Sequence, residues 1–331
     1  MKSTMKDVAR KAGVSTATVS HVINKTRFVE KETKKKVLEV MKKLDYYPNS
    51  AAQSLRSQKT KNIGLIVPNI SNFFFTDVIE GIEKILKKYG YTFILANSDE
   101  NIEIEKEQIR IFNNKLVDGL IVAPVLGDHT FLKKLLNRKN PIVFIDRKPQ
   151  DYCPGDCVLV ENTEGAYKAV SELIKKGYSK IGIIAAMPGL TTSDERVEGY
   201  KKALVDYGMK VDQNLLKFGN GRYNSGYKIM KEFLLDSNIT ALFVGNNLMT
   251  IGAMQFLKEK KVKVPDELAI IGFDDYNWAS IVNPPLSVVK QPSCKIGEKA
   301  AELLIRRIKK EETGDYKEYR LPTELVIRES F

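Results

Sequence analysis

The order of hydrophobic and polar positions divides the chain into a short helical region and a long region of alternating strands and helices. After residue 61, short apolar runs alternate with longer segments in which apolar residues recur every three or four positions. The expected strands are 63–67, 92–95, 119–123, 142–145, 157–160, 180–185, 241–244, 268–272 and 287–290. The expected helices are 76–89, 104–114, 164–176, 196–207, 225–235, 249–260 and 294–309. This alternation predicts an α/β fold with doubly wound parallel sheets.

The pattern before residue 48 predicts three short helices. Thr4 can cap a first helix, and Gly13 is the residue favoured for a left-handed helix stop. Ser15 can cap a second helix over 16–24, and a third is expected over 32–44. The side chains expected inside this bundle from the second and third helices are Val19, Val22, Ile23, Val37, Leu38, Met41 and Leu44. A helix, a glycine turn and a second helix with small polar outward residues form the helix-turn-helix pattern.

Composition and charge narrow the class of protein. The chain has 331 residues, of which 43% are hydrophobic and 28% charged, an ordinary balance for a globular protein. No run approaches the roughly 18 uncharged apolar residues that cross a bilayer, and the N-terminus lacks the apolar core of an export signal. Most of the net charge of +12 lies in residues 1–62, which contain 15 Lys and Arg but 5 Asp and Glu. A small basic unit joined to a nearly neutral body indicates a polyanionic partner.

Two consecutive stretches carry a resemblance to a known family. MKDVARKAGVSTATVSHVINKTRFVEKETKKKV resembles the headpiece of the lactose-repressor/galactose-repressor (LacI/GalR) family, and is closest to its purine and ribose repressors. LDYYPNSAAQSLRSQKTKNIGLIVP resembles the hinge and the first core strand of that family. The resemblance implies a helix-turn-helix headpiece at 1–48, a hinge at 49–61, and an effector-binding and dimerisation core at 62–331 like that of periplasmic sugar-binding proteins. Lobe 1 would hold about 62–160 and 292–320, and lobe 2 about 161–290 and 321–331.

The resemblance also implies which residues contact DNA. Bases would be read by Thr16, Ala17 and His21, and the DNA backbone would be contacted by Ser15, Thr18, Ser20 and Asn24. Ala17 replaces the larger or hydroxyl-bearing residues often found there, so it offers little beyond contact with a thymine methyl. The hinge sequence NSAAQSLRS permits a helix that is too short to be stable alone. In the family, two such helices pair in the minor groove; Leu55 matches the wedge between base steps, Ala52 allows close contact, and Arg56 lies beside them.

A ligand is expected between two similar α/β lobes, at the carboxyl ends of their strands. Loops after the expected strands carry carboxylates, amides, guanidinium groups and aromatic rings, which together suit a hydroxylated ring. The resemblance places sugar contacts at Asn72, Phe74, Phe75, Asp146, Arg147, Arg196, Tyr223, Asn246, Asp274 and Gln291. Phe73 replaces the proline common in the corresponding family motif, which alters that loop.

Enzyme and metal chemistry have little support in the sequence. The two histidines do not form a Ser/His/Asp set, because His21 lies on the second helix and His129 is expected at the surface. Cys153 and Cys157 have no zinc-site spacing and no histidine neighbour, and no glycine-rich phosphate loop appears. We therefore expect no enzyme activity, no cofactor and no metal. A sugar-binding protein for transport and a sugar-converting enzyme are the rival classes.

The sequence thus predicts a cytoplasmic transcription regulator, most simply a repressor, that binds a pseudo-palindromic DNA operator as a homodimer and has no membrane partner. A small sugar-like effector would gate its operator affinity, with a pentose such as ribose preferred. Two alternatives stay open, namely a global catabolite-type regulator with a phosphoprotein or phosphosugar corepressor, and a purine-responsive repressor. The operator, the regulated genes, and the choice between inducer and corepressor stay open as well.

Overall fold

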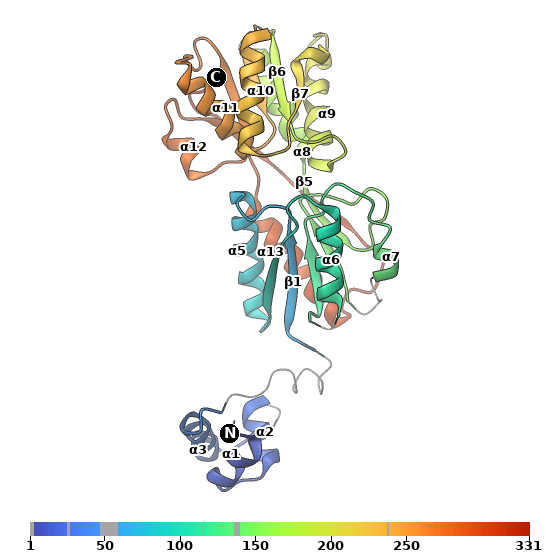
Figure 1. The fold of residues 1–331 in the computed structure, drawn as a ribbon, viewed down its shortest axis with the longest axis vertical. Coiled ribbons are helices and arrows are strands. Elements are labelled where there is room, and N and C mark those ends of the chain that lie inside the picture. Colours follow the sequence, from blue (N-terminus) through green and yellow to red (C-terminus); the bar gives the residue numbers. More distant parts are fainter. Residues whose placement is uncertain (1–2, 25–26, 47–58, 115, 136–139, 237) are drawn as a thin grey trace. The chain divides into compact units, whose positions relative to one another are not determined.

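The chain divides into two compact units, Met1–Thr60, which includes the headpiece, and Lys61–Phe331, which we call the core (Figure 1). The structure, a computed structural model, describes residues 3–24, 27–46, 59–114, 116–135, 140–236 and 238–331. Within these ranges no helix is long and apolar enough to cross a membrane.

Three helices make up the described part of the headpiece, α1 (Met5–Ala12), α2 (Thr16–Asn24) and α3 (Lys31–Lys43). Helix α1 begins after Thr4 because the Thr4 side chain accepts a hydrogen bond from the Asp7 N–H, while the Asp7 carboxylate accepts one from the Thr4 N–H. The helix ends at Gly13, whose φ of +64° is accessible to glycine at little cost. The predicted cap and stop of this helix are therefore confirmed.

The hydrophobic interior of the headpiece is made of small apolar side chains from all three helices. Its buried members are Val8, Ala9, Ala12, Val19, Val22, Val37 and Val40. The prediction that Leu38 packs inward is wrong, since its side chain is 48% exposed. Val37, Val40 and Met41 follow the three- and four-residue spacing of one helix face, and Leu38 lies about 100° away from Val37 around the helix.

The described residues of the core form two six-stranded sheets with the same arrangement of strands. The first sheet has the order β11 (Glu318–Leu321), β5 (Asp156–Val160), β4 (Ile142–Ile145), β3 (Gly119–Val122), β1 (Asn62–Val67) and β2 (Thr92–Asn97). The second has the order β12 (Glu324–Val326), β10 (Ser287–Lys290), β9 (Ala269–Phe273), β8 (Ala241–Val244), β6 (Ile181–Ala185) and β7 (Leu216–Phe218). Neighbours pair in parallel except β10 and β12, so the predicted doubly wound architecture is confirmed. The short strands β7, β11 and β12 were not among the expected strands.

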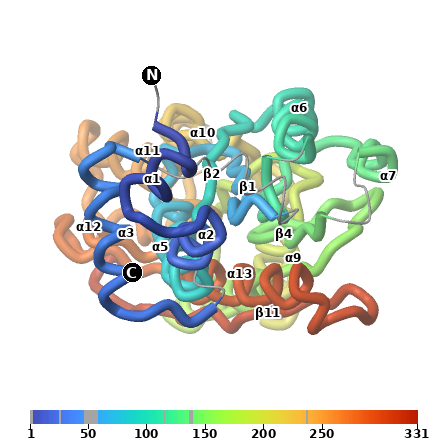
Figure 2. Tube along the Cα trace, turned by 90° about the horizontal axis from the view of Figure 1, so that it is seen from below, coloured from blue at the N-terminus to red at the C-terminus, as the bar shows by residue number. Residues whose placement is uncertain are grey.

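Helices cover both faces of each sheet, and each sheet with its helices forms one lobe. Lobe 1 carries α5 (Phe73–Lys88), α6 (Ile102–Asn113), α7 (Leu132–Leu135) and α13 (Ser293–Lys309). Lobe 2 carries α8 (Asn162–Lys175), α9 (Thr191–Asp206), η1 (Gln213–Leu215), α10 (Tyr223–Asp236), α11 (Asn247–Glu259) and α12 (Asn277–Ile281). Figure 2 shows α6 and α13 on opposite sides of β1 and β4. Helices α5 and α9 begin at Phe73 and Thr191, earlier than the predicted starts at 76 and 196.

The chain passes between the lobes three times, after β5, after β10 and between β11 and β12. The second passage returns α13 to lobe 1, where it packs against α5. A Cβ at Gly81 would collide with the Cys294 carbonyl oxygen, and one at Gly297 with the Val78 carbonyl oxygen. These two glycines therefore let the backbones of α5 and α13 touch.

Candidate DNA-reading helix and ligand cleft

Helix α2 presents the small polar side chains expected to read DNA. The described members of that set are Ser15, Thr16, Ala17, Thr18, Ser20, His21 and Asn24, all of them exposed or half-buried. The Ser15 Oγ accepts a hydrogen bond from the Thr18 N–H at 3.0 Å, so Ser15 caps the helix as predicted. The predicted hinge contacts Ala52, Leu55 and Arg56 lie outside the described residues.

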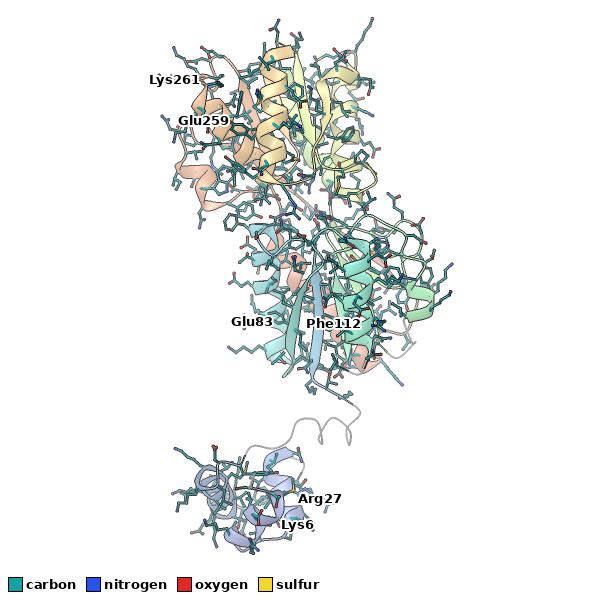
Figure 3. All side chains as sticks on the ribbon, in the orientation of Figure 1. Lys6, Arg27, Glu83, Phe112, Glu259 and Lys261 are labelled. Carbon is teal, nitrogen blue, oxygen red and sulfur yellow. The ribbon has the colours of Figure 1, made fainter. Side chains whose placement is uncertain are left out.

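Two physical features of the headpiece suit a phosphate backbone. Lys6 and Arg27, labelled in Figure 3, are exposed on its surface, as is Lys11 at the end of α1. The N-terminus of α2 adds a partial positive charge, which favours an anionic oxygen. Thr16 and Ala17 at this end are small, so the helix terminus can approach base edges closely.

The core holds a cavity between its lobes, at the carboxyl ends of strands from both sheets. It comprises about 630 Å³ of space, part of which opens to solvent. Of the predicted effector contacts, those that line the cavity are Asn72, Phe74, Phe75, Asp146, Arg147, Arg196, Asn246, Asp274 and Gln291. Tyr223 is not among the lining residues; it begins α10 with its side chain 37% exposed.

Two lining aspartates occupy equivalent positions in the two lobes. Asp146 follows β4 and Asp274 follows β9, and each of these strands is third in the order of its sheet. Both residues have a positive φ, +64° and +80°, and both are buried, with 7% and 6% of their surface exposed. The repeated architecture therefore directs one carboxyl group from each lobe into the same cavity.

Burial and nearby charges set the electrostatics of this pair. Burial raises the pKa of Asp146 to about 6, an increase that the positive charges of Arg147 and Arg196 oppose. Burial also raises the pKa of Asp274, again against the charge of Arg196. The Arg196 guanidinium lies 3.6 Å from the centre of the Phe273 ring, and its Nε donates to the Asn162 Oδ1 at 2.9 Å. A rigid cation is thus held beside two buried carboxyl groups.

Arg147 is held by an acidic residue that was not among the predicted contacts. Its two terminal nitrogens donate to the two carboxylate oxygens of Glu100 at 2.8 and 2.9 Å, a bidentate ion pair. Its Nε lies 3.4 Å from the Asp146 Oδ2. The Arg147 Nε and the Gln291 Oε1 are buried polar atoms without a hydrogen-bond partner among the described residues.

Two predicted contacts also stabilise the lobes themselves. The Asn72 side chain caps α5 through the Phe74 N–H and accepts a hydrogen bond from the Asn247 Nδ2 of lobe 2 at 2.8 Å. The Asn246 side chain caps α11 by accepting from the Met249 N–H at 2.8 Å. These amides therefore fix the geometry of the cavity as well as line it.

The aromatic residues at the start of α5 divide between packing and contact across the lobes. Phe74 and Phe75 are 3% and 1% exposed, and their rings meet edge to face at 5.0 Å. Phe73 is 50% exposed, and its ring lies 5.8 Å from that of Tyr276 in lobe 2. Phe74 and Phe75 are thus largely buried side chains that also line the cavity, since both belong to the hydrophobic core of lobe 1.

Several residues that line the cavity were not predicted from the sequence. They are Glu100, Ala186, Met187, Leu190, Asn220, Gly221 and Arg222. Arg222 and Asn220 follow β7, a strand too short to be recognised, and Glu100 follows β2 within a turn. Arg222 forms an ion pair with Asp99 of lobe 1 at 2.7 Å, so it bridges the lobes at the rim of the cavity.

The expectation that His129 lies at the surface is wrong. The residue is 1% exposed, its Nε2 lies 2.9 Å from the Glu105 carboxylate, and its Nδ1 lies 2.9 Å from the Gly127 carbonyl oxygen. The buried Glu105 carboxylate also accepts from the Val125 N–H, so this group is a satisfied structural network. Among the described residues, no cluster of three or more His, Cys, Asp or Glu side chains is placed to hold a metal ion.

Comparison with known proteins gives the family of the chain. The model of the bacterial regulatory proteins of the lacI family matches residues 4–49, and that of the periplasmic binding proteins and sugar binding domain of the LacI family matches residues 60–329. Over 99% of its length the chain is 36% identical to the HTH-type transcriptional repressor PurR of Photobacterium profundum, of which it covers 98%.

Two solved structures are similar over most of the chain. One is the lac repressor dimer bound to operator and the anti-inducer ONPF, with a TM-score of 0.88, 25% identity, and coverage of 100% of this chain and 99% of that one. The other is a LacI family transcriptional regulator from Enterococcus faecium with bound ribose, with a TM-score of 0.73, 29% identity, and coverage of 81% and 98%. The relative is named as a transcriptional repressor, and the two family models together span most of the chain. This chain belongs to the LacI family of DNA-binding transcription regulators.

Proposed function

We propose that this regulator is a homodimeric repressor whose affinity for a pseudo-palindromic operator depends on a small uncharged polyol in the cleft, with a pentose such as ribose preferred. The observation that carries the proposal is the balance of charge around the cavity. Its acidic lining residues are Asp146, Asp274 and Glu100, and its basic ones are Arg147, Arg196 and Arg222. An uncharged ligand leaves this balance undisturbed.

Sugar hydroxyls suit this lining because each hydroxyl both donates and accepts a hydrogen bond. Carboxylates at Asp146 and Asp274 accept, while the guanidinium of Arg147 donates. The Arg147 Nε and the Gln291 Oε1, a donor and an acceptor, are buried without a hydrogen-bond partner among the described residues. A buried polar group without a partner costs about 1–3 kcal/mol, so a ligand with neighbouring hydroxyls gains affinity by satisfying both.

The charge balance also separates the alternatives. A phosphosugar would bring up to two further negative charges beside the buried carboxyl groups of Asp146 and Asp274, which is unfavourable. A purine base is the second candidate, because a relative 36% identical to this chain is named PurR. The edge-to-face packing of Phe74 on Phe75 favours a sugar over a flat base, which needs a free ring face for stacking. The similar regulator with bound ribose supports the pentose.

We propose that three segments have different roles. The headpiece at 1–48 reads DNA, the hinge at 49–61 contacts the minor groove, and the core at 62–331 binds the effector and dimerises. Within the core, lobe 1 is 62–160 with 292–320, and lobe 2 is 161–290 with 321–331. A ligand that bridges the lobes shifts their relative position and thereby the tendency of the hinge, with Ala52, Leu55 and Arg56, to form a helix in the minor groove. A coupling free energy of about 1–3 kcal/mol between ligand binding and operator binding changes operator affinity 5- to 150-fold. This activity belongs in the cytoplasm, where operator DNA is found.

Calorimetric titration of the full chain tests the ligand class. D-ribose, other pentoses, hypoxanthine, guanine and ribose 5-phosphate are the ligands to compare. We expect binding of a pentose and its loss in Asp274→Asn, with Asp212→Asn as the matched control. Asp212 is an exposed aspartate of the same lobe that caps a turn by accepting from the Asn214 N–H, a role that asparagine can also fill. Binding of a base but no pentose would replace the proposed ligand by a purine.

Gel-shift titration tests the gating. A fluorescent palindromic duplex selected from a random pool competes with unselected duplex at a fixed moderate salt concentration. We expect a preference for the selected duplex that changes at least fivefold when the ligand is added. No preference for any palindrome would overturn the DNA-binding role, and a preference that is unaffected by a bound ligand would overturn the gating.

A further inference from the structure

Two cysteines of lobe 1 lie against each other outside the cleft. Cys153 precedes a bend at Gly155, and Cys157 lies on β5 just after it. Their Sγ atoms are 3.2 Å apart, and both thiols are free. A Cβ at Gly155 would collide with the Ile142 carbonyl oxygen, so a glycine is needed for this bend to lie so close to β4.

We propose that Cys153 and Cys157 are a redox modification site, at which a hydroperoxide converts the two thiols into a reversible intrachain disulfide. A disulfide has an S–S length of about 2.05 Å, so the sulfur atoms must approach by only about 1 Å. Cys153 lies in an irregular segment without strand or helix pairing, which can accommodate such a shift by side-chain rotation.

The surroundings assign different roles to the two thiols. Cys153 is half-buried and reaches solvent, whereas Cys157 is 2% exposed. The hydrogen bond between the two thiols lowers the pKa of Cys153, and the positive charge of Lys148 lowers it further. The same hydrogen bond, together with burial, raises the pKa of Cys157. Cys153 is therefore the first nucleophile, and Cys157 is the resolving thiol.

The chemistry balances with a hydroperoxide as the oxidant. The Cys153 thiolate attacks one peroxide oxygen, the O–O bond breaks, and the leaving oxygen takes up a proton as water or an alcohol. The Cys157 sulfur then attacks the resulting sulfenic acid, the S–O bond breaks, and the released hydroxide takes the Cys157 proton as water. Two thiols lose two electrons and two protons in all, and a dithiol reductant reverses the reaction.

The position of the pair connects it to the cleft through one segment. Asp146 and Arg147, at the start of that segment, line the cavity. Lys148 and Gln150 follow, and both bond to lobe 2: the Thr191 hydroxyl donates to the Lys148 carbonyl oxygen at 3.1 Å, and the Gln150 side chain donates to the Gly189 carbonyl oxygen at 2.8 Å. Cys153 ends the segment, so the disulfide forms a covalent anchor to β5 at its far end.

Thiol counting on the whole chain tests the proposal. The reduced chain has three free thiols. After a few equivalents of hydrogen peroxide and denaturation, we expect Ellman's reagent to count one thiol per chain, and dithiothreitol to restore all of them. Peptide mapping should find Cys153 joined to Cys157 within one chain, with the loss of two hydrogens.

Variants separate this site from nonspecific oxidation. Cys294→Ser removes the thiol on α13 and should keep the full response of the pair. In Cys157→Ser, the oxidised Cys153 should stop at the sulfenic acid and react with dimedone, and matching circular dichroism melts would establish that the variant folds. Retention of both thiols in the folded wild type, preferential oxidation of Cys294, or bridges between chains would overturn the proposal.

Discussion

Replacing Asp146 by asparagine tests whether a buried carboxylate that binds the ligand lowers the unfolding free energy of the ligand-free protein. Burial raises the pKa of this carboxyl to about 6, whereas the pKa of an aspartate in the unfolded chain is about 3.9. This increase in pKa corresponds to about 3 kcal/mol. The folded state binds the proton more tightly than the unfolded state, so stability from this group is greatest below about pH 4 and is lost as the pH rises to about 6.

Urea unfolding measures the effect, because Trp278 is the single tryptophan and lies on α12 of the core. At pH 7 we expect the ligand-free Asp146→Asn core to have an unfolding free energy up to about 3 kcal/mol above that of the wild type. The difference should shrink as the pH falls toward about 4, where the wild-type carboxyl is protonated. Ligand affinity should fall about 10- to 150-fold, since a hydrogen bond to a charged group contributes about 1.5–3 kcal/mol.

Asp275→Asn is the contrasting variant on the neighbouring lobe. Its carboxylate accepts a hydrogen bond from Arg328 at 2.7 Å, and its side chain is 12% exposed, so loss of this pair should destabilise the core at pH 7. The two substitutions should therefore change the unfolding free energy at pH 7 in opposite directions. An Asp146→Asn protein that is less stable than the wild type at pH 7, or a difference that does not depend on pH, would refute the electrostatic reasoning.

Three further variants probe other parts of the molecule. Arg222→Ala breaks the exposed ion pair with Asp99, so the unfolding free energy from thermal melting should change by less than about 1 kcal/mol. Ligand release measured by stopped flow should become several-fold faster. A large loss of stability would contradict this expectation. Thr4→Ala removes the capping box of α1 and should cost the headpiece about 0.5–2 kcal/mol, which weakens operator binding in gel shifts but leaves ligand affinity by calorimetry unchanged. Gly81→Ala forces a methyl group against α13 and should lower the unfolding free energy in urea by about 1–3 kcal/mol, whereas Gly314→Ala, with open space around it, should be close to neutral.

Local pattern was sufficient for most elements because their limits are set by nearby residues. Helix α2 has the predicted limits, since Gly13 stops the preceding helix and Ser15 caps the next. Strand β4 also matches, because its apolar run is bounded by a proline and by Asp146. Strands β7 and β11 were missed because they are short, carry charged residues and pair on one side only, so their stability comes from a neighbour distant in sequence.

Residue type and spacing by themselves determined the basic helix-turn-helix headpiece, the alternation of strands and helices, and the loops from which most cleft residues come. Only the tertiary structure decided which of those side chains meet, because contacts depend on strand order and on chain segments far apart in sequence. It brought Asp146 opposite Asp274 from repeated positions in two sheets, joined Glu100 to Arg147, and buried His129 against a glutamate on α6. It also set the two thiols of lobe 1 side by side, where their spacing alone had indicated no chemistry.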